Sequence, residues 1–562
     1  MIPINDYQIK TLYESNRTLI YRAQNKSTKE NVIFKILNKE YPTSYELKSI
    51  KHEYEILKKL ENIEGIPSPY ELSKFNNYHT IIMDDTDGTS LKQLMQTNSF
   101  CVEDILSIAI DIAVIIGEIH AAHIIHKDIN PGNIIFDHKS NRISIIDYGI
   151  STQLTIENPV LQSPNVLEGS LNYISPEQTG RMNRSLDYRT DYYSFGITLY
   201  ELLTQTIPFK SKDPMELIHS HIAKQPVPPH EINKEIPKTL SNIVMKLVSK
   251  NAEDRYQSSG GIILDLQECK EQIKVSGAIS EFSLAQNDIP ERFQIPQKLY
   301  GRVNEVNTLL SAFDRIILGT GEMILISGYS GIGKTVLVKE IYKPITRQRG
   351  YFISGKFDQF QRDIPYRAIV EAFSDLARQM LTEKKDILNN WVEKIISALG
   401  PNGQVIVDII PDMELVIGKQ PDILELGPAE AQNRFNHVFQ NFISVFTDHD
   451  HLLVMFIDDL QWADMASLKL IQLLMKTKKQ SLFIIGAYRD NEVNEAHPLI
   501  HIIDEIKKTD ASLHEISLSP LSSEHISQLI CDSFYCSKEK SDSLTNLVHN
   551  KTGGIHFLLM NS

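Results

Sequence analysis

The segment HKDINPGNIIFDHKSNRISIIDYG, residues 126–149, decides how the first half of the chain is interpreted. It ends in Asp147-Tyr148-Gly149 after the apolar run ISII, and such a triplet alone indicates only a turn that follows a strand. Here Asp128 and Asn133 precede it on the same segment. Phosphoryl transfer needs magnesium ligands and a carboxylate that orients the attacking hydroxyl, and these side chains are of the required types.

Further signals lie on both sides of this segment. Lys35 lies in the strand-like run VIFKIL, and Glu53 lies on a charged helix predicted from Tyr45 to Leu60. The later signals are Ser175-Pro176-Glu177, Asp191 and Arg255. Their order and spacing together resemble the eukaryotic-type protein kinase fold, over roughly half the chain.

The resemblance assigns a role to each of these residues. Lys35 would hold the α- and β-phosphates of ATP, and Glu53 would pair with it. Asp128 would be the catalytic carboxylate, and Asn133 and Asp147 would bind Mg²⁺. The activation loop would span residues 147–177, where the phosphorylation candidates are Ser151, Thr152 and Ser170.

Three departures from the kinase pattern point to weaker catalysis. The glycine-rich loop should lie in YESNRTLIY, but its glycine positions hold Tyr13, Ser15 and Thr18. Without glycine, close approach of the backbone to phosphates is harder. Lys127 replaces the usual arginine and cannot hold a phosphate with two parallel bonds, and Asn130 replaces the usual lysine. A pseudokinase is therefore an open alternative.

The pattern of apolar residues divides the chain in two. The first part has β-type runs followed by mostly helical stretches, which predicts an α+β domain. A proline-containing segment of weak periodicity follows. Beyond it, short strands alternate with helices, which predicts an α/β domain with a parallel sheet. The predicted strands are Met323–Ser327, Gly350–Ser354, Leu452–Ile457 and Leu482–Ala487, and the predicted parts are residues 1–275, a linker at 276–298, and 299–562.

The sequence MILISGYSGIGKTVLVKEI contains a complete phosphate-binding loop between an apolar strand and a helical pattern. Its backbone N–H groups and the helix N-terminus would face the phosphates. Lys334 would neutralise the β- and γ-phosphates, and Thr335 would offer its hydroxyl to Mg²⁺. The predicted nucleotide-binding residues of the loop are Gly328, Ser330, Gly331, Gly333, Lys334 and Thr335.

A second apolar strand, in HLLVMFIDDLQWAD, ends in two acids, as a Walker B strand does. Asp458 would hold Mg²⁺ directly or through water, and Asp459 would polarise the attacking water. Arg489 follows another strand, in SLFIIGAYRDNEV, where it could be a γ-phosphate sensor or an ordinary surface arginine.

This second half resembles the large P-loop ATPase domains of bacterial signalling proteins, of the AAA-like or STAND type, from LYGR at residues 299–302 to KTGGIHFL. A bilobal kinase-like fold followed by this ATPase resembles the N-terminal half of bacterial multi-sensor hybrid signalling kinases. That resemblance implies further ATPase segments, sensory GAF domains and a histidine kinase. We therefore expect the C-terminal part of the ATPase domain to be incomplete in this sequence.

The composition limits the possible partners. The formal net charge is -14, and binding a nucleic-acid backbone needs a basic face, so no nucleic acid is expected. The chain has only 4 Cys, which fits a reducing cytosol, and no apolar run reaches the ~20 residues of a membrane span. We expect a cytoplasmic protein with a protein substrate and possible self-association through the ATPase domain.

The sequence predicts a serine/threonine protein kinase that transfers the γ-phosphate of ATP to protein hydroxyls. A second domain would bind or hydrolyse ATP and act as a switch in signal transduction, and Mg²⁺ would serve both sites. In the alternative, the kinase-like domain is a pseudokinase scaffold and only the ATPase domain uses nucleotide. A nucleic-acid-dependent ATPase is a third possibility, against which the acidic charge and the kinase-like half argue.

Overall fold

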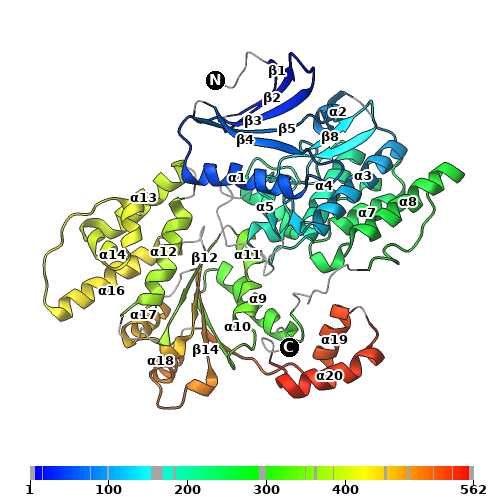
Figure 1. Cartoon of the computed structure of the whole chain (residues 1–562). Coiled ribbons are helices and arrows are strands. Elements are labelled where there is room, and N and C mark those ends of the chain that lie inside the picture. Colours follow the sequence, from blue (N-terminus) through cyan, green and yellow to red (C-terminus); the bar gives the residue numbers. More distant parts are fainter. Residues whose placement is uncertain are drawn as a thin grey trace. The chain divides into compact units, whose positions relative to one another are not determined.

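The chain forms two compact units. The first consists of residues 1–160, 167–180 and 185–292, and the second of residues 161–166, 181–184 and 293–562. The structure is a computed structural model (Figure 1). It describes residues 7–15, 17–75, 77–97, 100–153, 169–181, 185–289, 299–348, 350–359, 364–381, 383, 385–447, 452–476, 481–509, 512–534 and 536–555.

The first unit begins with a five-stranded sheet of order β1-β2-β3-β5-β4, in which all neighbours are antiparallel. Its strands are β1 (Tyr7–Glu14), β2 (Thr18–Asn25), β3 (Asn31–Leu37), β4 (Pro69–Phe75) and β5 (Tyr78–Asp84). The helix α1 (Ser44–Lys59) runs along one face of this sheet (Figure 1). It starts at a capping box, in which Thr43 and Glu46 each bond the other's backbone N–H.

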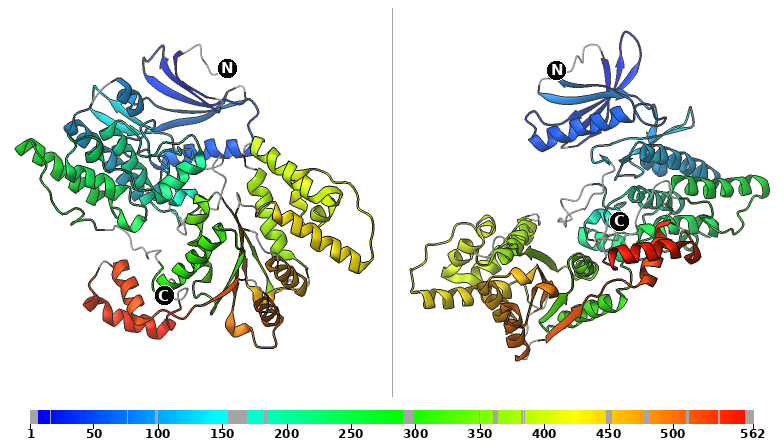
Figure 2. Two further views of the ribbon diagram at one scale, coloured as in Figure 1. Left: turned by 180° about the vertical axis from the view of Figure 1, so that it is seen from behind. Right: turned by 60° about the horizontal axis from the view of Figure 1, so that its bottom comes forward.

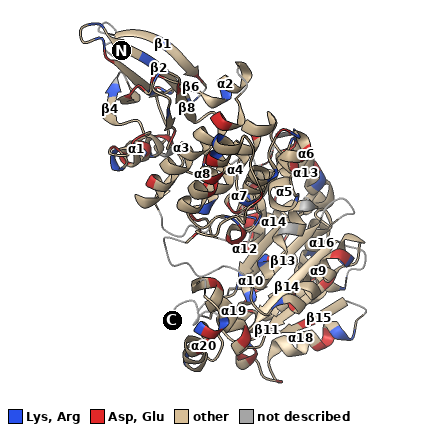
Figure 3. Cartoon of the chain, turned by 90° about the vertical axis from the view of Figure 1, so that its right-hand side faces the viewer, with Lys and Arg blue, Asp and Glu red and all other residues tan. Residues whose placement is uncertain are grey.

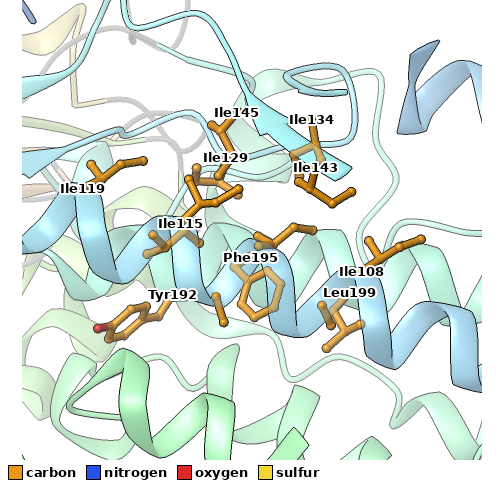
Figure 4. Packing of buried hydrophobic residues seen from close by; sticks show 14 of the residues in the cluster. Ile108, Ile115, Ile119, Ile129, Ile134, Ile143, Ile145, Tyr192, Phe195 and Leu199 are labelled. Atoms are coloured by element: carbon orange, nitrogen blue, oxygen red, sulfur yellow. The ribbon is translucent and has the colours of Figure 1, made fainter. Parts of the chain in front are cut away.

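The rest of the first unit is mainly helical. Its elements are β6 (Thr89–Ser90), α2 (Leu91–Thr97), α3 (Val102–Ala121), β7 (Ile124–Ile125), β8 (Ile134–Asp137), β9 (Arg142–Ile145), β10 (Thr152–Gln153), α4 (Arg189–Thr204), α5 (Pro214–Ala223), α6 (Pro229–Ile232), α7 (Lys238–Leu247) and α8 (Ser259–Ser276). Figure 4 shows isoleucines of α3 packed against Phe195 and Leu199 of α4 and against Ile129 and Ile134. This core anchors both ends of the segment that carries Asp128 and Asn133.

The second unit is built on a five-stranded sheet of order β12-β13-β14-β11-β15, and every pair in it is parallel. Its strands are β11 (Glu322–Ser327), β12 (Tyr351–Lys356), β13 (Leu453–Asp458), β14 (Leu482–Tyr488) and β15 (Ser512–Ser517). Alternate residues face opposite sides: Met455 packs in one buried cluster, and its neighbours Val454 and Phe456 pack in another. Both faces are therefore covered, as a parallel sheet requires.

Helices lie on both sides of this sheet (Figure 2). They are α9 (Val303–Ile317), α10 (Lys334–Lys339), α11 (Tyr342–Arg347), α12 (Arg367–Leu381), α13 (Lys385–Leu399), α14 (Gly403–Ile409), α15 (Glu414–Ile417), α16 (Pro428–Ser444), α17 (Met465–Met475) and α18 (Pro498–Lys507). The helices α19 (Ser523–Phe534) and α20 (Lys538–Thr552) form a separate small cluster with Tyr300 and Leu521. The α12–α16 segment is a helical insertion between β12 and β13.

The predicted fold classes are confirmed: an antiparallel sheet with a helical lobe comes first, and a parallel α/β domain follows. Within the two five-stranded sheets, the strands β4 and β15 were not predicted. Each includes several polar residues, in PYELSKF and SLHEIS, and each lies at an edge of its sheet, where one side needs no continuous apolar run. No helix in the described ranges is long and apolar enough to span a bilayer. Acidic and basic positions are interspersed along the helices (Figure 3).

A Gly355→Ala substitution should destabilise the second unit by about 1–3 kcal/mol, the usual cost of overpacking. A Cβ at Gly355 would lie 1.8 Å from the backbone oxygen of Ala368, so β12 and α12 would have to move apart. Gly427→Ala is the matched control, because the only atom near its Cβ would be a side-chain oxygen 3.9 Å away. Urea unfolding of the two variants measures the difference, and equal stability would contradict this packing.

Candidate functional site

In the first unit, Lys35 connects the sheet, the helix α1 and the Asp147 end of the segment at residues 126–149. Lys35 on β3 places its Nζ 2.6 Å from Glu53 Oε1 and 2.8 Å from Asp147 Oδ1. Glu53 is buried, so its charge depends on this partner. The Lys35 ammonium lowers the pKa of Asp147, and the two acids together raise the pKa of Lys35 although burial opposes this. Burial raises the pKa of Glu53, although the Lys35 ammonium opposes this, and the predicted pair is extended to a triad by Asp147.

The Asp128 carboxylate is held by groups on two sides. Asn133 Nδ2 donates to Asp128 Oδ2 at 2.9 Å and to its backbone oxygen at 3.0 Å. The backbone N–H of Ser170 donates to Oδ1 at 2.9 Å. Because Asn133 donates through its nitrogen, its own Oδ1 is left as an acceptor beside a carboxylate. The arrangement fixes the carboxylate and offers oxygen donors for a hard cation.

A buried acid positions the loop before Asp128. Asp191, 1% exposed, accepts the backbone N–H groups of His126 at 2.9 Å and Lys127 at 2.8 Å, and the Nε2 of His120 lies 2.8 Å away. Lys127 has φ 68°, and Asp147 has φ 70°. Such left-handed conformations are uncommon for these residue types and persist where the surroundings enforce them. The conformation of this loop is therefore stabilised by contacts with Asp191 rather than by the intrinsic backbone preference of its residues.

Two of the separated signals meet in a fully buried ion pair. Arg255 donates from both terminal nitrogens to Glu177, at 2.6 and 2.8 Å, and both residues are at most 2% exposed. Burial alone would raise the pKa of Glu177, but the attraction of Arg255 and its hydrogen bonds lower it to about 2. The bidentate geometry fixes the segment after residue 169 to the end of the helical lobe.

The loop that lacks glycine is a tight hairpin closed by serine. The Ser15 hydroxyl accepts the backbone N–H groups of Arg17 and Thr18 and donates to the Thr18 oxygen. Asn38 binds the Ser15 oxygen at 2.9 Å. The described residues of this hairpin all have negative φ, so none of these described positions requires glycine. Asn130, a further departure, bonds the Asp128 backbone and lies 3.4 Å from the Ser170 hydroxyl.

The phosphorylation candidates differ in accessibility. Ser151 is 3% exposed, and its hydroxyl donates to the His126 oxygen at 3.3 Å, so this conformation shields it. Thr152 lies on β10 and is half-buried. Ser170 lies beside Asp128, where a phosphate would bring negative charge next to a carboxylate. The rest of the predicted activation loop from 154 to 168 lies outside the described residues.

In the second unit, the phosphate-binding loop follows β11 and precedes α10. Gly328, Gly331 and Gly333 have φ of 147°, 75° and 103°, which L side chains rarely adopt. Lys334 is buried, which lowers its pKa, and its Nζ donates to the oxygens of Gly328 and Tyr329 at 2.7 and 2.9 Å. Ser330 is exposed in the loop. The Lys334 ammonium is therefore bonded within the loop itself.

The two acids after β13 take different positions. Asp458 Oδ2 lies 3.4 Å from the Thr335 hydroxyl, and burial together with Asp459 raises the pKa of Asp458. These two oxygen donors fit a magnesium ion, because a cation would relieve that charge. Asp459 is 4% exposed and lies 3.2 Å from Lys356 Nζ and 3.4 Å from Arg489 Nε.

The residues Lys356, Gln461 and Trp462, which contact Asp459 or Arg489, were not predicted. Lys356 ends β12, next to β13 in the sheet, and the signal available was a cation at the carboxyl end of a predicted parallel strand. Gln461 bonds both Asp459 and the Arg489 backbone, at 2.9 and 3.1 Å. Arg489 also stacks 4.7 Å over the Trp462 ring. No spacing in the sequence indicated that Asp191 would bind the loop before Asp128.

Comparisons with known proteins match one family model to each of the two units. The family model described as protein kinase domain matches residues 14–263, and the model described as AAA ATPase domain matches residues 298–485. Hybrid signal transduction histidine kinase G of Dictyostelium discoideum is 39% identical over 325 residues, which are 54% of this chain and 9% of that protein. Histidine protein kinase 1 of Candida albicans is 24% identical over 77% of this chain and 20% of its own length.

A bacterial relative aligns with a shorter part of the chain. A probable serine/threonine-protein kinase of Clostridium perfringens is 30% identical over 48% of this chain and 39% of its own length. The chain thus spans well under half the length of each of these relatives. The predicted resemblance to hybrid signalling kinases is confirmed. The chain contains a protein kinase domain followed by an AAA ATPase domain, and its homologues are hybrid histidine kinases and bacterial serine/threonine kinases.

Proposed function

We propose that the first unit is a serine/threonine protein kinase and that the second is an ATP-dependent switch attached to it. The observation that carries the proposal is the meeting of Lys35, Glu53 and Asp147 through contacts of 2.6 and 2.8 Å, with Asp128 fixed by Asn133. The similarity to bacterial serine/threonine kinases supports the same acceptor chemistry. Signal transduction is the setting that the hybrid histidine kinase relatives suggest.

In the proposed reaction, Lys35 leaves Asp147 for the α- and β-phosphates of ATP while Glu53 keeps its ammonium in place. Asn133 and Asp147 would hold Mg²⁺, which supplies positive charge to the phosphate oxygens. Asp128 accepts a hydrogen bond from the acceptor hydroxyl and orients its oxygen towards the γ-phosphorus. The new O–P bond forms as the bond to the β–γ bridging oxygen breaks, ADP leaves, and Asp128 takes the hydroxyl proton.

In the second unit, the phosphate-binding loop would hold a second ATP. Lys334 would bind the β- and γ-phosphates, and Thr335 and Asp458 would hold Mg²⁺. Asp459 would polarise the attacking water, and Arg489 would sense the γ-phosphate. Because Lys356 and Arg489 both pair with Asp459 here, a γ-phosphate that draws either cation away would free that carboxylate. The ATP-bound and ATP-free forms would then differ in the ion pairs of Asp459, and this difference would control self-association of the unit.

A pseudokinase scaffold is the second candidate, and two observations favour it. The β1–β2 hairpin presents the Ser15 turn in place of glycines, which keeps side chains where phosphates would approach. Asn130 places no charge beside Asp128. In this alternative, only the second unit would bind nucleotide.

Nucleotide occupancy distinguishes these candidates. Lys35→Ala and Lys334→Ala should each remove one class of bound Mg·ATP and leave the other, with affinity at the altered site reduced roughly tenfold or more, because charge-assisted hydrogen bonds contribute ~1.5–3 kcal/mol. Equilibrium dialysis with labelled ATP measures both classes. Lys10→Ala and Lys469→Ala, at exposed lysines of each unit, are the controls. Binding abolished by Lys334→Ala and untouched by Lys35→Ala would support the scaffold instead.

A further inference from the structure

A cavity of about 490 Å³ opens beside the Asp128 loop in the first unit. Its lining includes Asn130 and Ser170. Both contact Asp128, through the Asn130 bond to its backbone oxygen and the Ser170 N–H bond to its carboxylate. A protein segment whose hydroxyl reaches Asp128 would therefore lie in or against this cavity.

The charge of the cavity lining is positive, on a chain whose formal net charge is -14. The lining contains three lysines, Lys92, Lys210 and Lys212, and one acid, Glu201. Glu201 is already occupied, because the Tyr173 hydroxyl donates to it at 2.5 Å. None of the three lysines has an ion-pair partner within the described ranges. The cavity thus presents three exposed, uncompensated ammonium groups.

The three lysines come from two places in the chain, the start of α2 and the loop just before α5. Lys92 lies in the first turn of α2, and its backbone N–H bonds the Pro131 oxygen at 2.9 Å. Its Cδ would be 3.9 Å from a Cβ at Gly132, so the lysine stem lies across a position where the loop has no side chain. Lys210 and Lys212 lie just before α5, which is capped by Asp213. Figure 3 colours the basic positions on these elements.

We propose that this cavity selects acceptor segments with anionic side chains close to the phosphorylated serine or threonine. The inference rests on the proposed kinase function and specifies its substrate class. Electrostatic attraction over a Debye length of ~8 Å at physiological salt acts within the cavity, so the overall acidity of the chain does not cancel it. An acceptor with basic flanking residues would be repelled by the three lysines, and the only acid of the lining, Glu201, is already bonded to Tyr173. Binding of such an acceptor is therefore disfavoured.

The anionic groups could be carboxylates or phosphates already present on the acceptor, since lysine binds both. A matched peptide set separates these sources. Each peptide has a single serine with flanking Asp/Glu, phosphoserine, Ala or Lys residues. We expect both anionic sets to bind roughly tenfold more tightly than the alanine set, with the lysine set weakest, and we expect the difference to shrink as salt is raised. Phosphoserine alone binding well would assign the site to primed acceptors.

The test uses the full chain and two readouts. Fluorescence anisotropy without ATP measures peptide affinity with the Asp128→Asn variant, so that no peptide is phosphorylated, and phosphate transfer by the otherwise unchanged chain gives kcat/KM. The variant Lys92→Ala/Lys210→Ala/Lys212→Ala should lose the anionic preference in both readouts. Lys139→Ala/Lys234→Ala/Lys274→Ala removes the same charge from exposed positions outside the cavity and should keep the preference.

The outcomes separate this inference from the kinase proposal. Equal affinity for anionic, neutral and basic peptides, or a preference that survives loss of the three cavity lysines, would overturn the acceptor inference while transfer activity persists. Anionic peptides that bind through the lysines but are never phosphorylated would overturn the kinase function and leave an anionic-segment binding site.

Discussion

Replacing Asp128 by asparagine should reduce phosphate transfer by roughly 10²- to 10⁴-fold, the usual contribution of a positioned acid–base group. The asparagine side chain has the same shape, so the Ser170 N–H can still bond an oxygen there. It cannot accept a proton, and its amide would face the Asn133 donor that now bonds Asp128 Oδ2 at 2.9 Å. Both effects act on the reacting hydroxyl rather than on the fold.

The readout is transfer of the γ-phosphate to the chain itself or to an acceptor peptide. Asp111→Asn is the matched control, because this acid is exposed on α3 and should leave transfer unchanged. Nucleotide affinity of the first unit should stay within about threefold of the parent, since Lys35 and Glu53 are untouched. Equal transfer by Asp128→Asn and the parent chain would remove Asp128 from the mechanism.

Replacing Arg255 by alanine should destabilise the first unit by about 3–5 kcal/mol, because Glu177 would be left as a buried charge without its partner. Arg142→Ala is the control. The side chains of Arg142 and Glu64 are 70% and 79% exposed, and their ion pair is expected to contribute less than about 1 kcal/mol to the stability of the fold. Both tryptophans of the chain, Trp391 and Trp462, lie in the second unit, so tryptophan fluorescence should report no change there.

The acid dependence of the Arg255→Ala effect follows from the pKa of Glu177. The folded pKa of Glu177 is about 2, below the value of 4.5 expected for a glutamate in the unfolded chain. A lowered carboxyl pKa stabilises the fold fully above the unfolded value, and this contribution is lost as the pH falls from about 4.5 towards 2. Amide hydrogen exchange of α4 at pH 7 and pH 4 measures the stability difference between the parent and Arg255→Ala. A difference that is larger at pH 4 than at pH 7 would contradict the lowered pKa of Glu177.

Sequence analysis predicted best those site residues that lie close together in the chain. The phosphate-binding loop was predictable because its glycines, Lys334 and Thr335 act through adjacent backbone positions. Lys35 and Glu53 were predictable only through their order in a known fold, and the structure brings them within 2.6 Å. The parallel sheet followed from apolar runs of strand length alternating with helices.

The contacts that sequence reasoning could not supply are those between elements far apart in the chain. The pairing of Lys356 and Arg489 with Asp459 depends on the order of the strands, which places β13 between β12 and β14. The basic cavity depends on α2 and the start of α5 meeting beside residues 130–132. The Ser15 turn shows why missing glycines do not alone decide the β1–β2 loop, since a serine hydroxyl can satisfy the same backbone groups.

The most direct test of the central claim is phosphoamino-acid analysis of the full chain after incubation with ATP labelled in its γ-phosphate. The kinase proposal predicts covalent phosphoserine or phosphothreonine in the parent chain and in Lys334→Ala, and roughly 10²- to 10⁴-fold less in Asp128→Asn. ATP hydrolysis that forms no phosphoprotein and is abolished by Lys334→Ala would contradict it and leave the second unit as the only ATP-using site.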